Sequence, residues 1–226
     1  MHLLPPFRRF MKIFHPEGIP APGTKFYNLI SSTKIFQHHY ELIAKDILSF
    51  SSEGSILDIG TGPGWLLLKM HEISPELKLT GVDISPSMVA KARSNIAAAG
   101  FSQKIEILKA DAVRLPFDDD SFDIVASTGS IHHWKNPVAG LNEVYRVLKP
   151  GCHALMYDLA TDTPSSILND SAHKFGRLRM LIFWLHSFEE PFYSQKSFEE
   201  MSRATLFKQG TTRFAGLLCC LILYKQ

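Results

Sequence analysis

The nine residues LDIGTGPGW, at positions 57–65, directly follow a short apolar run. Gly60, Gly62 and Gly64 have no Cβ atom, so a ligand can lie against the backbone and bind the N–H groups that open a following helix. Asp58 adds a carboxylate that could bind a cationic group. A tight turn between a strand and a helix would need similar glycines, so the loop alone does not decide between a ligand site and a turn.

Two further acidic residues favour a ligand site. Asp83 ends a second apolar run, where a carboxylate can accept hydrogen bonds from both hydroxyls of a ribose. Asp111 ends a third, where it could accept from the amino group of an adenine. The carboxyl ends of parallel strands meet at one edge of a sheet, which is where such sheets bind ligands. The sequence therefore predicts a site for a nucleoside.

A nicotinamide dinucleotide is the competing ligand, and the spacing of the glycines argues against it. The fingerprint G-x-G-x-x-G, starting at Gly60 or Gly62, would require glycine at Trp65 or Leu67. The indole of Trp65 would block close packing of the helix on the strand. Asp58 would also repel a pyrophosphate. We therefore expect a nucleoside that carries a positive charge.

The elements that must position these residues alternate along the chain. Apolar runs predict five strands, at 55–60, 77–84, 104–111, 121–128 and 152–159. Helical spacing and capping signals, with Ser85 as one N-cap and Gly100 as one C-terminal glycine, predict helices at 33–50, 65–73, 86–99, 137–149 and 195–204. Residues 208–226 predict two strands in an antiparallel hairpin. This alternation is typical of an α/β protein with a doubly wound sheet and helices on both faces.

Four segments in this order resemble the class I S-adenosylmethionine-dependent methyltransferases, in the subgroup of the ubiquinone and menaquinone biosynthesis enzymes. They are ILDIGTGPG, GVDIS, KADAVRLPFDDDSFDIV and EVYRVLKPGC, and the resemblance runs from about Ser55 to Asp158. It implies a Rossmann-like seven-stranded sheet of order 3-2-1-4-5-7-6 with strand 7 antiparallel, in agreement with the expected hairpin. It also implies S-adenosylmethionine as the cofactor.

The resemblance assigns residues to the parts of this cofactor. The residues around the methionine portion would be Asp58, Gly60, Thr61, Gly62, Gly64 and Thr128. The ribose would lie at Asp83 and Ile84, and the adenine at Asp111 and Ala112. Met88 could pack on the adenine or the ribose, or it could belong to the core.

Two histidines could act in catalysis. A sulfonium is already a strong methyl donor, so a base is needed only when the acceptor must lose a proton. His132 and His133, in STGSIHHW after the fourth strand, would face the methyl group, and either could be that base. In the alternative interpretation, one of them packs beneath Trp134 and the other faces solvent.

Other polar residues are expected on the acceptor side without a firm role. Tyr157 and Asp158 end the fifth strand, and His38 and His39 lie on the helix at 33–50, which in similar enzymes helps to roof the pocket. For the second pair of histidines, a structural role is the alternative interpretation.

The chain divides into an N-terminal arm or lid, 1–32, and a methyltransferase domain, 33–226, with an acceptor-side lid insertion at about 160–193. The arm and the insertion contain the apolar segments FRRFMKIF and RLRMLIFWLHSF. If they roof the pocket, they favour a small apolar or aromatic acceptor, methylated on oxygen or carbon, or contact with a membrane surface. Ordinary core is the alternative for both segments.

Composition narrows the class of protein. With 226 residues and 45% hydrophobic content, the chain predicts one domain, and a net charge of +2 spread along it predicts a small-molecule partner rather than a nucleic acid. Three cysteines without metal-ligand spacing predict no metal site and a reducing, cytoplasmic location. A regulatory or scaffold protein that binds the cofactor without transferring methyl groups, and a protein methyltransferase, are the alternatives. The sequence leaves the oligomeric state open.

Overall fold

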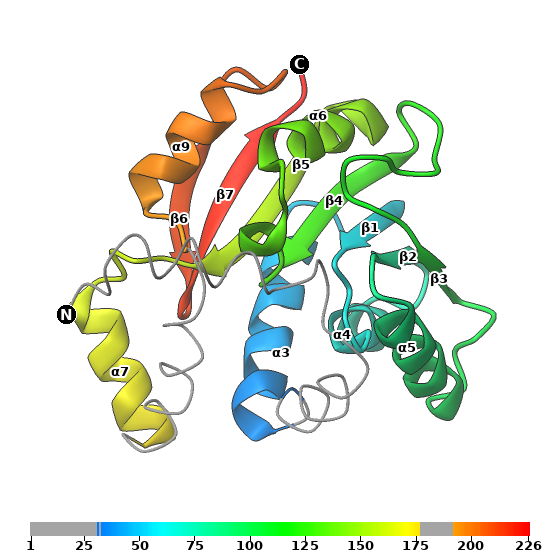
Figure 1. Ribbon diagram of the computed structural model, residues 1–226. Coiled ribbons are helices and arrows are strands. Elements are labelled where there is room, and N and C mark those ends of the chain that lie inside the picture. The colour runs from blue at the N-terminus through cyan, green and yellow to red at the C-terminus, as the bar shows by residue number, and fades with distance from the viewer. Residues whose placement is uncertain (1–30, 32, 177–191) are drawn as a thin grey trace.

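The computed structural model describes residues 31, 33–176 and 192–226, which contain a seven-stranded sheet (Figure 1). Its order is β3-β2-β1-β4-β5-β7-β6. The strands are β1 (Ser55–Ile59), β2 (Lys78–Asp83), β3 (Ile105–Lys109), β4 (Phe122–Thr128), β5 (Leu148–Leu159), β6 (Thr211–Ala215) and β7 (Leu218–Tyr224). β7 pairs in antiparallel register with β5 and β6, and the other pairs are parallel. The predicted order and the antiparallel strand 7 are confirmed.

Helices cover both faces of this sheet (Figure 1). On one face lie α3 (Lys34–Leu48), α4 (Trp65–Ile73) and α5 (Pro86–Ala98), and on the other lie α6 (Pro137–Val147) and α9 (Gln195–Arg203). A short 3-10 helix, Ile131–His133, follows β4, and α7 (Ser165–Phe175) follows β5. The helices α6 and α9 on one side, and α3 to α5 on the other, thus bury the strands that position the site.

The core has two layers because successive residues of a strand point to opposite faces. Ile56 packs in the layer beneath α3, α4 and α5, whereas Leu57 packs in the layer beneath α6 and α9. Cys220 and Cys219 of β7 divide between the two layers in the same way. Both faces are covered, which explains why these strands are apolar along most of their length.

The start of β5 differs from the prediction by four residues. β5 begins at Leu148 rather than at Cys152, so Pro150 and Gly151 lie within the strand and do not end the preceding helix. The physical reason is that Leu148 already pairs with Phe122 of β4.

The start of α5 also differs in its cap. The helix begins at Pro86 as predicted, but the Ser85 side chain makes no capping hydrogen bond to the helix. Its hydroxyl lies 2.9 Å from Ser87 Oγ instead, and its backbone N–H donates to Asp83. Gly100 follows the helix with a φ of 83°, a left-handed conformation that favours glycine.

Candidate active site

The predicted cofactor residues gather at the carboxyl edge of the sheet. Asp83 and Thr128 are the last residues of β2 and β4, and Asp58 and Asp158 are the second-last residues of β1 and β5. The sequence predicted that Asp111 ends β3, but Asp111 lies two positions beyond the last residue of that strand. The point where the strand order reverses lies between β1 and β4, and a doubly wound sheet binds its ligand there.

The glycine loop between β1 and α4 has a left-handed backbone. Gly60, Gly62 and Gly64 have φ angles of 75°, 53° and 80°. A Cβ atom at Gly60 would collide with the Ser130 side chain, and one at Gly64 would lie 3.4 Å from Ala92 Cβ. Backbone conformation and neighbouring elements therefore account for part of the glycine requirement, as the alternative of a tight turn between strand and helix expects.

Asp83 connects this loop to the second strand. Its Oδ2 accepts a hydrogen bond from Gly62 N–H at 2.9 Å, and its Oδ1 accepts from Ser85 N–H at 2.8 Å. Burial raises the pKa of the Asp83 carboxyl, while the two N–H groups oppose this shift because they favour the ionised form. Asp83 thus shapes the loop, in addition to the contact with ribose that the sequence predicts.

Asp58 is a buried carboxyl at the centre of this edge. It is 2% exposed, and burial raises its pKa to about 7, opposed by the nearby Thr61 hydroxyl and reinforced by the negative charge of Asp83. A cationic group bound beside it would favour the ionised form. The ammonium of an amino acid is such a group.

Buried polar atoms without a hydrogen-bond partner in the described part of the chain are concentrated in the same region. At the ends of β1 and β4, in the glycine loop and at the start of α4, they are Asp58 Oδ1, Thr61 Oγ1, Trp65 Nε1, Ser127 Oγ and Thr128 Oγ1. Nearly all buried polar groups in proteins are hydrogen-bonded. This region is therefore suited to a ligand that brings both donors and acceptors.

The remaining predicted cofactor residues lie at β2 and β3. Ile84 is half-buried directly after β2, and Met88 is buried in the first turn of α5. Asp111 and Ala112 are half-buried in the loop after β3, where Asp111 Oδ1 accepts from Val113 N–H at 3.1 Å. The contacts of these residues with a cofactor stay predictions.

His132 forms a buried pair with Asp158. The His132 Nδ1 and its backbone N–H lie 2.7 Å and 3.1 Å from Asp158 Oδ2, and the two residues are 5% and 1% exposed. The pairing is possible because β4 and β5 are parallel neighbours, with Thr128 beside Tyr157. A carboxylate at Nδ1 favours the proton on that nitrogen, which places the lone pair of the neutral ring on Nε2.

His133 lies beside this pair but is exposed, with its ring centre 4.0 Å from that of His132. The exposure of His133 agrees with the alternative interpretation, in which one histidine faces solvent. The Trp134 Nε1 donates to Ser130 Oγ at 3.1 Å. The structure adds one residue that the sequence did not suggest, since the Phe192 ring lies 4.6 Å from the His132 ring. Phe192 reaches this position because the adjacent Tyr193 forms a bridge with Ala160, at the end of β5.

The structure corrects the expected position of Tyr157 and shows the contacts of the histidine pair on α3. Tyr157 does not share the site with Asp158, because it points to the opposite face of β5 and donates to Asp46 of α3 at 2.7 Å. His38 Nε2 lies 2.7 Å from Lys174 Nζ, and the rings of His38 and His39 contact Phe175 of α7. This second pair of histidines therefore joins α3 to α7.

Comparison with known proteins gives the class. The family model described as "Methyltransferase domain" matches residues 57–156. The chain is 32% identical over 162 residues to a ubiquinone/menaquinone biosynthesis C-methyltransferase of Geotalea daltonii, covering 71% of this chain and 68% of that one. It is 30% identical to a demethylmenaquinone methyltransferase of Chlorobaculum tepidum, covering 84% and 81% of the two chains.

A solved structure from Methanococcus maripaludis, assigned to the S-adenosyl-L-methionine-dependent methyltransferases, shares the fold. Its TM-score is 0.73 at 22% identity, and the match covers 94% of this chain and 96% of that one. The protein belongs to the S-adenosylmethionine-dependent methyltransferases with the class I fold. S-adenosylmethionine is its cofactor, and the acidic and unpaired polar groups at the carboxyl edge fit the cationic amino-acid end of that molecule.

The predicted N-terminal arm and acceptor-side insertion lie only partly within the residues that the structure describes. The arm segment FRRFMKIF and the insertion segment RLRMLIFWLHSF lie outside the described residues. Within the described ranges, no helix is long and apolar enough to cross a membrane. Among the same residues, no group of three His, Cys, Asp or Glu side chains could hold a metal ion.

Proposed function

We propose that this methyltransferase methylates a small apolar or aromatic acceptor on oxygen or carbon, with His132 as the base. The observation that carries the proposal is the buried His132–Asp158 pair, which stands at the end of β4 and β5 beside the unpaired polar atoms of β1 and β4. A dedicated base suits an acceptor that must lose a proton, such as a phenol or an activated ring carbon.

The residues divide the work between binding and proton transfer. S-adenosylmethionine, when bound, supplies the methyl group and leaves as S-adenosylhomocysteine. Asp58 and Asp83 would hold the methionine ammonium and the ribose, and Asp111 the adenine. His132 Nε2 would take the proton from the acceptor as the new bond forms. Asp158 would then stabilise the resulting imidazolium, to which it already holds Nδ1.

The relatives support a quinone-type acceptor. One relative above is named a ubiquinone/menaquinone biosynthesis C-methyltransferase, a name that specifies methylation of carbon, and the other is named a demethylmenaquinone methyltransferase. A hydroquinone ring can lose a phenolic proton and accept the methyl group on oxygen or on a neighbouring ring carbon. Such acceptors often carry apolar chains and partition into lipid, so we include contact with a membrane surface in the proposal.

The experiment is transfer of a labelled methyl group from S-adenosylmethionine to benzo- and naphthohydroquinones with apolar side chains. Mass spectrometry of the product distinguishes ring methylation from ether formation. We expect His132→Ala to lower kcat by about 10²-fold or more, in the range of general-base catalysis, with the dissociation constant of S-adenosylhomocysteine unchanged.

His133→Ala is the matched control because His133 is adjacent and exposed. Equal kcat in His132→Ala and the wild type would contradict the assignment of His132 as the base. Transfer to peptide substrates but not to any hydroquinone would refute the acceptor class. Assays with vesicles of anionic phospholipid test the membrane contact, which predicts co-sedimentation of the protein.

A further inference from the structure

The loop between β3 and β4, residues 110–121, is attached to helix α6. This loop carries Asp111, which the proposed cofactor site places at the adenine. Glu143 Oε2 accepts a hydrogen bond from Leu115 N–H at 2.9 Å, and the Arg146 carbonyl accepts from Asp120 N–H at 3.0 Å. The position of the loop therefore depends on residues of α6.

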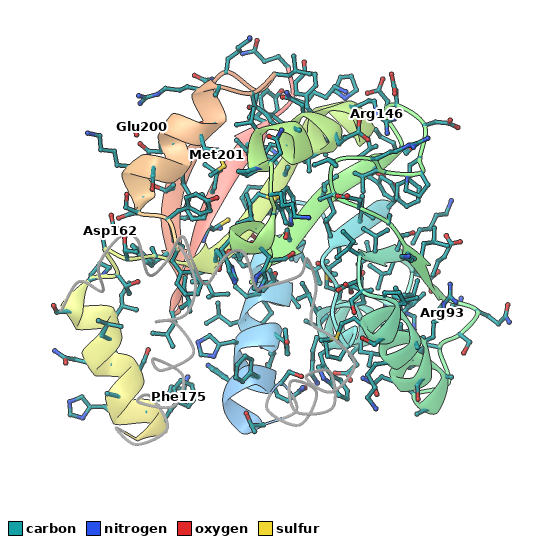
Figure 2. All side chains as sticks on the ribbon, in the orientation of Figure 1. Arg93, Arg146, Asp162, Phe175, Glu200 and Met201 are labelled. Carbon is teal, nitrogen blue, oxygen red and sulfur yellow. The ribbon has the colours of Figure 1, made fainter. Side chains whose placement is uncertain are left out.

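Arg146 is the centre of this attachment, at the end of α6 beside the loop (Figure 2). Its Nη1 donates to Phe117 O at 2.7 Å and to Asp119 Oδ1 at 2.9 Å. Its Nη2 donates to Leu115 O at 3.0 Å and to Glu143 Oε2 at 2.8 Å, and its Nε donates to Glu143 Oε1 at 2.9 Å. These contacts use all the N–H donors that a guanidinium has.

The ion pair of Arg146 and Glu143 has a well-defined geometry. Both side chains are half-buried, and the hydrogen bond from Arg146 lowers the pKa of the Glu143 carboxyl, so the pair is ionised at neutral pH. The planar guanidinium fixes the directions of its donors, and a lysine ammonium cannot reproduce that arrangement.

The contact is close enough to Asp111 to act on it. Three residues separate Asp111 from Leu115, and Arg114 N–H donates to Asp111 O at 3.0 Å, which closes a tight turn. Asp111 Oδ1 is held within the same turn by Val113 N–H. A displacement of Leu115 would therefore move Asp111 as well.

We propose that Arg146, held by Glu143, is a positioning residue that places Asp111 for recognition of the adenine amino group. Arg146 does this from α6, through the carbonyls of Leu115 and Phe117, without contact with the cofactor. The proposal rests on the proposed function, in which Asp111 binds the adenine.

The test compares two ligands in calorimetric titrations of the full chain. S-inosylhomocysteine has an oxo group where S-adenosylhomocysteine has the adenine amino group, so the ratio of the two dissociation constants measures recognition of that group. We expect the wild type to prefer S-adenosylhomocysteine. We expect Arg146→Lys to reduce this preference about fivefold, the contribution of about one hydrogen bond.

Two further variants sharpen the test. Glu143→Gln keeps the size of the side chain and should reduce the preference in the same direction. Lys149→Met removes a neighbouring ion pair, Lys149 Nζ to Asp123 Oδ1 at 2.8 Å, which does not reach the loop. This matched control should keep the wild-type preference.

Each outcome decides a separate point. A wild-type ratio in both Arg146→Lys and Glu143→Gln, even with a lower Tm, would assign the pair a purely structural role and overturn the proposal. Loss of folded protein alone scales both dissociation constants equally and leaves the ratio unchanged. A wild type that binds both ligands equally would remove Asp111 from the adenine and also overturn the proposal. A wild type that does not bind S-adenosylhomocysteine would instead refute the proposed cofactor site.

Discussion

The raised pKa of Asp58 predicts that binding of S-adenosylhomocysteine depends on pH. Asp58 is buried, and its pKa of about 7 means that the carboxyl is about one tenth ionised at pH 6 and about nine tenths ionised at pH 8. The ammonium of the ligand favours the ionised form and therefore lowers this pKa on binding. Binding releases a proton, so affinity must fall as the pH is lowered through 7.

The magnitude follows from the ionised fraction. If only ionised Asp58 binds the ammonium, the dissociation constant should be about tenfold larger at pH 6 than at pH 8. Calorimetric titrations in buffers of different ionisation enthalpy measure the proton release directly, and about half a proton per site is expected at pH 7. Asp58→Asn should bind weakly at every pH, without this proton release. Adenosine, which lacks the amino-acid portion, should show no pH dependence at Asp58.

An affinity for S-adenosylhomocysteine that is flat from pH 6 to pH 8 would refute this reasoning. The same holds if Asp58→Asn keeps the full proton release, because another group would then be its source.

Three other changes test separate parts of the account. Asp83→Asn replaces an acceptor of two N–H bonds with an amide that also presents a donor, so titration should show cofactor affinity weaker by about 1–3 kcal/mol, and unchanged affinity would contradict the assignment. Asp158→Asn removes the charge beside His132, so kcat should fall by about 10²-fold with cofactor affinity retained; equal kcat would argue against the pair as the base. Gly140→Ala places a Cβ 2.5 Å from Trp134 Cε3, so urea unfolding should show a loss of about 1–3 kcal/mol, whereas no loss would mean that Trp134 moves freely.

The gathering of the glycine loop, Asp58 and Asp83 at one edge of the sheet could be predicted largely from sequence, because its constraints are local. The glycine loop, Asp58 and Asp83 each adjoin the end of an apolar strand, and parallel strands bring such ends to one edge. The double role of Asp83 was not predictable, since its bond to Gly62 N–H depends on how the loop folds back over β2.

The acceptor side could be predicted only in part because its contacts are long-range. His132 lies in the 3-10 helix that follows β4, whereas Asp158 lies in β5, and the parallel pairing of β4 with β5 brings the two together. Tyr157 and Asp158 face opposite sides of β5 because successive residues of a strand alternate, and our expectation that both face the acceptor did not take this alternation into account. Phe192 is brought to His132 by a bridge at the end of β5, and no local pattern marks that bridge.

The most direct test of the cofactor site is a calorimetric titration of the wild type and Asp83→Asn with S-adenosylhomocysteine, with NAD as the control. The account predicts that the wild type binds S-adenosylhomocysteine and not NAD, and that Asp83→Asn weakens this binding. Binding of NAD, or equal affinity of the two proteins for S-adenosylhomocysteine, would contradict the site as it is assigned.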